Sequence, residues 1–374
     1  MYRMSILFLS FSISLTCCKK QEASNDEITL TPEYARGFVI HQNGDYMEIE
    51  VKQPFPNSTT SYRYLLIPQN AELPMHDPEA QLVRVPVKRM VCTSTSHIAL
   101  LDLLEATSTL VGFPTTDLVS SPTARARIDS GYVTDLGMDS EINMESLLSI
   151  APDMVMGYSI TGDMIKLSKV KEMGIPVIIN GEYLEDHPLG RAEWIKFMAY
   201  FLGREHQADS IFHKVKVAYE TSKGLTMNIQ IKPTVLTGIL YGDTWFMPGG
   251  QNYASTMFQD AGYRYLWDDD LSTGFIKLSF ESVYERGQDA DYWIGVGSFG
   301  SMAELQNAEK RYALFKPFID TQVYTYDARK GSTGGSEYLE LGYSRPDIIL
   351  KDLIKIAHPD LLPDHELYFH RRLE

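Results

Sequence analysis

Short apolar segments alternate with amphipathic helical patterns over residues 87–180, and the same alternation returns over residues 233–359. Apolar segments of this length, separated by helices, are typical of βα units built around a mainly parallel sheet. Between the two regions, residues 189–224 carry two helical patterns, and the second, roughly 20 residues long, would span about 30 Å. A chain of 374 residues also exceeds the size at which one core usually keeps growing. The sequence therefore predicts an α/β fold of two Rossmann-like lobes joined by a single long α-helix.

The region before the first lobe has a different pattern. Residues 36–67 hold β-rich stretches with an Asn-Gly turn signal in QNGDY, which predicts an N-terminal β-hairpin extension followed by a further strand. We therefore expect six segments: a signal peptide (1–17), a lipidated tether (18–30), a β-rich extension (31–85), an N-lobe (86–203), a linking helix (204–225) and a C-lobe (226–374).

The N-terminus, MYRMSILFLSFSISLTCCKK, places one early cation before a short apolar run. The run is too short for a transmembrane helix, which takes about 20 residues, and it fits a signal peptide. LTCC at its end resembles a bacterial lipobox, so we expect Cys18 to be lipidated, with Cys17 as the alternative. An ordinary signal peptide with two incidental cysteines is the other interpretation. With Cys18 lipidated, Cys92 is the remaining thiol, and no internal disulfide is expected.

Composition and motifs narrow the class of protein. The formal net charge of −15 at pH 7 argues against nucleic acid as a partner, because phosphates are bound by basic surfaces. The nine histidines are scattered, so we expect neither a metal site nor a cofactor of the protein's own. His97 fits the start of a helix better than a role as a metal ligand. The chain lacks G-x-S-x-G, P-loop and G-x-G-x-x-G motifs, which disfavours an enzyme.

A similar phrase occurs in both lobes, as MESLLSIAPDMVMG in the first and as FESVYERGQDADYWIG in the second, although the two are not strict duplicates. Each copy puts a glutamate, Glu145 or Glu281, in the first turn of a predicted helix, with Asn143 or Ser279 as the expected N-cap. A carboxylate at that place is favoured by the helix dipole, so local physics alone explains both glutamates as helix-start residues. Both glutamates lie on the helix that precedes an equivalent strand in each lobe, and this recurrence needs a second explanation.

Five phrases are spread over roughly residues 85–365, a region that makes up most of the mature chain: DLGMDSEINMESLLSIAPDMVMG, HPLGRAEWIKFMAYFLGREHQADSIF, NYASTMFQDAGYRYLWDDD, LSFESVYERGQDADYWIG and RPDIILKDLIKIAHPDLLP. In order and spacing they resemble the periplasmic binding proteins of ABC importers for iron complexes, haem and cobalamin. The resemblance implies two lobes bridged by one rigid helix, with the ligand held between them. It also implies that a glutamate on each lobe, here Glu145 and Glu281, binds an arginine-lined pocket of a permease subunit.

The resemblance further implies a monomeric, lipid-anchored substrate-binding protein of the cell envelope, on the periplasmic side of a bacterial membrane. Its partners would be an ABC permease dimer with its ATPase subunits, the membrane that holds the lipid, and a small-molecule metal complex. The cargo would be a ferric siderophore, haem or cobalamin, so any iron or cobalt would belong to the ligand. A cell-surface capture or sensor lipoprotein without a permease is the alternative, and it would not need both glutamates.

Ligands of open α/β lobes bind at the carboxyl ends of the strands, and several aromatic residues fall in the loops expected there. Flat or metal-centred ligands bury well against such rings, although ordinary loop packing would explain any one of them. A Gly-rich loop adds two cations that could bind an anionic ferric chelate or a haem propionate, the alternative being a solvated loop. The candidate ligand-binding residues are Tyr158, Tyr183, Tyr241, Trp245, Arg329, Lys330 and Tyr338. Tyr158 and Trp245 are the strongest candidates, because their polar, Gly-flanked loops leave them no obvious core.

Overall fold

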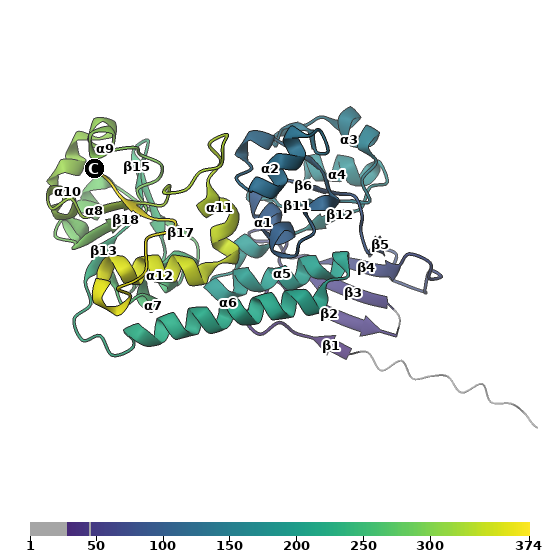
Figure 1. The fold of residues 1–374 in the computed structure, drawn as a ribbon, viewed down its shortest axis with the longest axis horizontal. Coiled ribbons are helices and arrows are strands. Elements are labelled where there is room, and N and C mark those ends of the chain that lie inside the picture. Colours follow the sequence, from purple (N-terminus) through teal and green to yellow (C-terminus); the bar gives the residue numbers. More distant parts are fainter. Residues whose placement is uncertain (1–27, 45) are drawn as a thin grey trace, which may run out of the picture.

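The computed structural model describes residues 28–44 and 46–374, which form two α/β lobes and a separate N-terminal β-sheet (Figure 1). The predicted signal peptide, Cys17, Cys18 and most of the tether lie outside the described residues. The two lobes lie side by side, with long helices running beneath both (Figure 1). The predicted α/β fold of two lobes is confirmed, and the N-terminal extension has more strands than predicted.

The N-lobe is built on a parallel sheet with the strand order β12-β11-β6-β7-β8. Alternate residues of its central strands belong to two different hydrophobic clusters, with Met90 and Cys92 in one and Val91 in the other, so both faces of the sheet are covered. The strands are β6 (Met90–Cys92), β7 (Leu110–Phe113), β8 (Thr134–Asp135), β11 (Met154–Gly157) and β12 (Val177–Ile179), with a short β9 (Gly137–Met138) and β10 (Glu141–Ile142) pair beside them. The helices are α1 (Thr95–Leu103), α2 (Pro122–Asp129), α3 (Met144–Ile150) and α4 (Ile165–Glu172).

The C-lobe repeats this plan with the order β16-β13-β18-β19-β20, in which β20 runs antiparallel to its neighbour and the other strands are parallel. A three-stranded antiparallel sheet, β14-β15-β17, is an addition that the sequence pattern did not predict. The strands are β13 (Thr234–Leu236), β14 (Ile239–Tyr241), β15 (Thr244–Pro248), β16 (Arg264–Tyr265), β17 (Phe275–Leu278), β18 (Tyr292–Ile294), β19 (Val323–Thr325) and β20 (Arg371–Arg372). The helices are α7 (Tyr253–Asp260), α8 (Phe280–Gly287), α9 (Met302–Ala308), α10 (Lys316–Ile319), α11 (Glu337–Leu341) and α12 (Pro346–Ala357).

Helices α5 (Pro188–Leu202) and α6 (Glu205–Thr226) connect the lobes. Gly203 ends α5 with a φ of +66°, a left-handed conformation that glycine adopts at little cost. Helix α6 then runs from beside the N-terminal sheet to the C-lobe (Figure 1). At its C-terminal half, the Tyr219 hydroxyl donates a hydrogen bond of 2.6 Å to Asp260 of α7. One continuous helix therefore contacts both lobes.

The repeated phrase takes the same local structure in both lobes. The side chains of Asn143 and Ser279 accept hydrogen bonds as the N-caps of α3 and α8, as predicted. Asp153 accepts from two backbone N–H groups just before β6, and Asp291 accepts from the backbone N–H and the hydroxyl at the start of β13. Each aspartate thus ties the start of its own strand to the start of the neighbouring strand.

The N-terminal extension is a five-stranded sheet in the order β1-β2-β3-β4-β5. All neighbours are antiparallel except β4 and β5. Its strands are β1 (Ile28–Leu30), β2 (Phe38–Asn43), β3 (Tyr46–Val51), β4 (Tyr62–Pro68) and β5 (Gln81–Val85). The side-chain amide of Gln81 makes two hydrogen bonds with the backbone of Val177, and the Tyr64 hydroxyl accepts one from the N–H of Ile179. The extension therefore packs against the β12 edge of the N-lobe.

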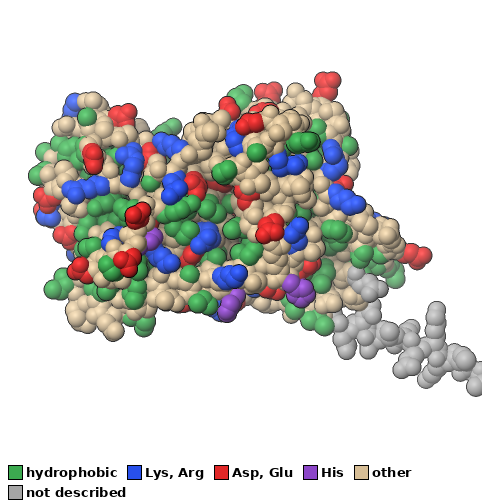
Figure 2. Space-filling model, viewed as in Figure 1, with side chains coloured by type: hydrophobic (Ala, Val, Ile, Leu, Met, Phe, Trp, Pro, Cys, Tyr) green, Lys and Arg blue, Asp and Glu red, His purple; other side chains and the backbone are tan. Residues whose placement is uncertain are grey.

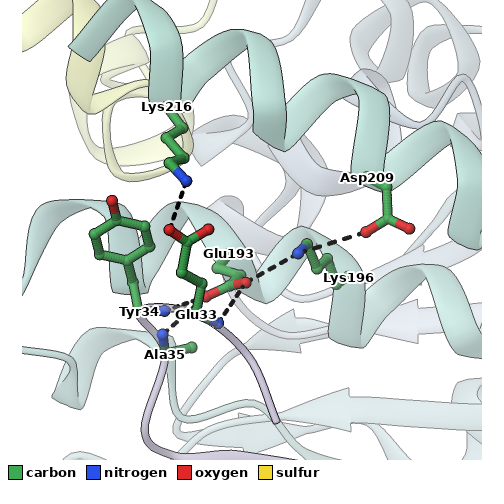
Figure 3. A network of polar contacts seen from close by, with 7 residues as sticks. All are labelled: Glu33, Tyr34, Ala35, Glu193, Lys196, Asp209 and Lys216. Atoms are coloured by element: carbon green, nitrogen blue, oxygen red, sulfur yellow. Dashed lines mark hydrogen bonds and ion pairs between the residues drawn. The ribbon is translucent and has the colours of Figure 1, made fainter. Parts of the chain in front are cut away.

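Two buried carboxylates near and on α5 hold the chain that links β1 to β2. Glu193, which is fully buried, accepts hydrogen bonds of 3.0, 2.7 and 2.9 Å from the N–H groups of residues 33–35 (Figure 3). Lys196 lies 3.0 Å from Glu193 and compensates its charge. Glu185 similarly accepts from the N–H groups of residues 36 and 37 and from the indole N–H of Trp194. Removing either carboxylate would leave several buried donors without a partner, so the extension is fixed firmly to the N-lobe.

Candidate ligand-binding site

A cavity of about 780 Å³ opens between the two lobes, and we call it the interlobe cavity. Its volume lies within the range of small-molecule sites, roughly 300 to 1,000 Å³. On the face shown in Figure 2, cationic and anionic side chains are interspersed rather than segregated. The N-lobe contributes Ala99, Asp102, Leu103, Ser120, Ser121, Pro122, Arg125, Ala126 and Asp129, and the C-lobe contributes Arg329, Lys330, Gly331, Ser332, Glu337, Glu340, Leu341 and Tyr368.

The carboxylate of Glu340, on α11, joins the two lobes at one wall of this cavity. It accepts hydrogen bonds of 2.7 Å each from the backbone N–H groups of Ser120 and Ser121 in the N-lobe. Burial raises the pKa of Glu340 to about 7, although these hydrogen bonds oppose the rise. The group that fastens the lobes together is therefore a carboxyl that can exist in either protonation state near neutral pH.

The segment before α11 approaches the N-lobe backbone closely, and glycines make that approach possible. A Cβ atom at Gly335 would overlap the carbonyl oxygen of Leu118, and one at Gly331 would lie 2.6 Å from the Cα of Ser120. Between them, the Thr333 hydroxyl donates a 2.7 Å hydrogen bond to an N-lobe carbonyl. The Gly-rich sequence after β19 is thus a contact between lobes.

Arg329 and Lys330 lie in the cavity wall, in the loop where the sequence placed them. Lys330 is neutralised by Asp327 at 2.9 Å. The guanidinium of Arg329 lies 4.0 Å from the ring centre of Tyr368 and makes no ion pair within the described part of the chain. The Tyr368 hydroxyl in turn donates a 2.5 Å hydrogen bond to Glu337. Arg329 is therefore an exposed cation, supported by an aromatic ring, at the edge of the cavity.

Tyr368 comes from the C-terminal segment, and the sequence pattern gave no sign that it would reach the cavity. Asp352, fully buried on α12, accepts hydrogen bonds from the backbone N–H groups of Tyr368, Phe369 and His370. Imidazole nitrogens of His365 and His370 lie 2.7 and 3.1 Å from the same carboxylate. Burial by itself raises the pKa of Asp352, but these hydrogen bonds hold it well below its usual range. One charged side chain thus fixes the position of Tyr368.

Tyr158 and Tyr183 lie together at the carboxyl end of the N-lobe sheet, with ring centres 6.4 Å apart, but neither lines the interlobe cavity. The Tyr183 hydroxyl donates a 2.6 Å hydrogen bond to the carbonyl of Ser159. His97 packs beside Tyr158, wholly buried in α1, where burial lowers its pKa to about 3. This half-buried aromatic pair is therefore separate from the cavity that the two cations line.

Tyr338 is one of the predicted residues close to the cavity, because its α11 neighbours Glu337 and Glu340 line the wall. Its own ring points away into a stack with Tyr326, at a centre-to-centre distance of 4.7 Å. Tyr241 is 81% exposed at the end of β14 and does not line the cavity either.

The expectation that Trp245 lacks a core is wrong. The residue lies on β15 with no exposed surface, and its ring stacks on Trp293 at 5.5 Å and packs against Tyr312. Its indole N–H donates to the carbonyl of Thr237 at 3.0 Å, so its polar atom is satisfied inside the protein. The unpredicted pairing of β15 with β17 turns the polar, Gly-flanked stretch into a buried strand. Trp245 therefore supports the C-lobe core and cannot contact a ligand in the cavity.

Glu145 and Glu281 are both exposed in the first turns of α3 and α8. Within the described residues, Glu145 forms no ion pair, whereas Glu281 lies 3.2 Å from Arg311. Arg311 also pairs with Glu309 at 3.0 Å and stacks on Phe280, so it is held in place. Arg311 thus contacts the Glu281 carboxylate while leaving most of it exposed, and this makes the two glutamates unequal.

Two further features concern metals and membranes. No three or more His, Cys, Asp and Glu side chains within residues 28–44 and 46–374 are grouped as metal ligands. Among the helices of that same part of the chain, none has the length and apolar character needed to cross a bilayer.

Residues 90–329 match the family described as periplasmic binding protein. An uncharacterized lipoprotein of Methanocaldococcus jannaschii is 27% identical over 77% of this chain and 69% of its own length, and a second is 25% identical over 100% of this chain and 99% of its own. The periplasmic haem-binding protein RhuT of Roseiflexus sp. RS-1 is similar in structure, with a TM-score of 0.56 and 20% identity, over 73% of this chain and 99% of its own. A possible iron-binding protein of Staphylococcus epidermidis has a TM-score of 0.57 and 18% identity over the same shares. The family match thus begins at β6 and leaves out the N-terminal sheet.

Replacing Glu340 with Gln should change how stability depends on pH. An unfolded glutamate titrates at about 4.3, and burial raises the pKa of Glu340 in the folded protein to about 7. The stability that its protonated form contributes is therefore fully present below its unfolded pKa and is lost as the pH rises through 7. We expect the free energy of unfolding of the wild type to fall, relative to that of Glu340→Gln, across this range. Urea denaturation at each pH measures it, and parallel curves for the two proteins would contradict the assignment.

Proposed function

The chain belongs to the periplasmic binding protein family, and we propose that it is the lipid-anchored substrate-binding protein of an ABC importer. The family and the similar structures are solute-binding proteins, not enzymes. Its cargo would be a small-molecule metal complex, either a ferric siderophore, haem or cobalamin, held in the interlobe cavity. The observation that carries the proposal is a cavity of about 780 Å³ walled by both lobes, with the guanidinium of Arg329 at its edge.

The guanidinium of Arg329 favours an iron complex over cobalamin. Lys330 lies in the same wall but pairs with Asp327, so Arg329 is the cation available to an anionic ligand, and a cobalamin site would need no such cation. An anionic chelate or a propionate would gain a charge-assisted hydrogen bond from the Arg329 guanidinium. Tyr368, Leu103 and Leu341 offer apolar surface for the body of a flat ligand. That one similar structure is a haem-binding protein supports the same choice.

The two lipoprotein relatives support attachment of the protein to the cell envelope by a lipid, for which Cys18 is the proposed site and Cys17 the alternative. We place the protein as a monomer on the periplasmic side of a bacterial membrane. Its partners would be a permease dimer with ATPase subunits, bound through Glu145 and Glu281. The exposure of both side chains, each on the first turn of an equivalent helix, supports this pairing.

Ligand binding can be tested by titrating the protein with haemin, several ferric siderophores and cobalamin while following tryptophan quenching. We expect saturable binding of an anionic iron complex. Arg329→Ala should raise its Kd about tenfold, the effect of losing one charge-assisted hydrogen bond. Lys310→Ala, which removes an exposed cation outside the cavity, is the matched control and should leave the Kd unchanged. If the wild type and Arg329→Ala bind the ligand with equal affinity, Arg329 does not contribute to the binding site.

Docking can be tested with the double variant Glu145→Arg and Glu281→Arg. It should abolish uptake of the cargo by cells while leaving the Kd of the purified protein unchanged, because the permease pocket would meet like charge. Glu172→Arg and Asp360→Arg make the same charge change at exposed sites, one in each lobe and neither on α3 or α8, and should preserve uptake. Normal uptake by the double variant would instead favour a capture lipoprotein that works without a permease.

A further inference from the structure

The start of the described chain and an exposed loop both lie at one end of the strands of the N-terminal sheet. The antiparallel register pairs Ile28 with Gln42, so the first residue of β1 lies beside the turn between β2 and β3. The strand β4 ends at the same edge, because Met47 near that turn pairs with Leu66. Residues 69–80 therefore leave the sheet where the chain enters it from the N-terminus (Figure 1). We call Ile28 and residues 69–80 the tether edge.

The loop of the tether edge presents apolar side chains outward and is braced at both ends. Met75 is 98% exposed and Leu73 is 50% exposed, and Ile28, at the same end of the sheet on the outer strand β1, is 52% exposed. At the start of the loop, the Arg84 guanidinium donates hydrogen bonds of 2.9 and 2.6 Å to two carbonyls, those of residues 68 and 71. Near its end, Asp77 lies 3.1 Å from a guanidinium on β4. The loop is thus tied to the sheet on both sides of Leu73 and Met75, and both side chains are exposed.

We propose that the tether edge rests on the lipid bilayer, with Leu73 and Met75 entering its interfacial layer. The proposal depends on the proposed lipid anchor at Cys18. The lead from Cys18 to Ile28 is about ten residues, and even a fully extended chain of that length reaches only about 36 Å. An anchor on so short a lead keeps the tether edge close to the membrane, since this is the edge at which the chain enters the fold.

The chemistry of the loop suits a neutral lipid surface. Apolar side chains at an interface are stabilised in proportion to the apolar area they bury. The carboxylates of Glu72, Asp77 and Glu79 flank them, so attraction to anionic headgroups does not contribute. The contact would therefore be shallow, would depend on apolar burial, and would form on zwitterionic lipid.

Such a contact would orient the whole protein, because the extension does not move independently of the N-lobe. Glu193 holds residues 33–35 through backbone hydrogen bonds (Figure 3). Glu185 holds residues 36 and 37 in the same way, and Gln81 pairs with the N-lobe edge strand. The family match begins only at β6, so this orienting element is an addition to the family's common fold.

The test uses the lipidated full chain in phosphatidylcholine vesicles, with and without brominated acyl chains that quench nearby tryptophan. The tryptophan of Met75→Trp should be quenched about twofold by the brominated lipid, as expected for a side chain at the interface. Met227→Trp is the matched control, since Met227 is 78% exposed at the far end of α6 and its replacement should not be quenched. The four native tryptophans are buried, and the wild type supplies their background.

Flotation of the vesicles distinguishes failure of the membrane contact from failure of the proposed lipid anchor. If the protein floats but the tryptophan of Met75→Trp is not quenched, or is quenched no more than that of Met227→Trp, the membrane contact is overturned and the anchor stands. Protein that does not float overturns the anchor, and the contact fails with it. Quenching of the tryptophan in Met75→Trp, without quenching of that in Met227→Trp, supports the proposal.

Discussion

The carboxylate of Glu340 is the contact on which the geometry of the proposed site depends. It reaches from α11 of one lobe to two backbone N–H groups of the other, and the interlobe cavity lies against it. The glycines at 331 and 335 allow the approach that makes these hydrogen bonds possible. Because the carboxyl is buried, its charge is costly, and its pKa of about 7 expresses the balance between burial and hydrogen bonding.

Other elements restrict how far the lobes can move. Helix α6 contacts both lobes, and α5 carries the carboxylate of Glu193, which ties the N-terminal extension to the N-lobe. In the C-lobe, Asp352 fixes the C-terminal segment and so positions Tyr368 against Arg329. The cavity wall thus depends on buried charges some distance from it. Such walls are preformed, which reduces the ordering cost of binding a ligand.

The sequence predicted what depends on local pattern. The two lobes, the N-caps Asn143 and Ser279, and the location of Arg329 and Lys330 all follow from periodicity and from the rule that strand ends form sites. Trp245 was misplaced because it is buried by residues distant along the chain, among them Trp293 and Tyr312, and because β15 pairs with β17. Tyr368 was missed because the return of the C-terminal segment depends on Asp352, a contact that no local pattern shows. Contacts between residues far apart in the sequence determine the positions of both side chains.

Amide hydrogen exchange of the full chain, with and without a saturating iron complex, tests most directly whether the interlobe cavity holds the ligand. We predict protection in both walls together, over residues 120–129 and 329–341, with no change in the N-terminal sheet. Protection confined to the surroundings of Tyr158 and Tyr183, or to one lobe, would contradict the account.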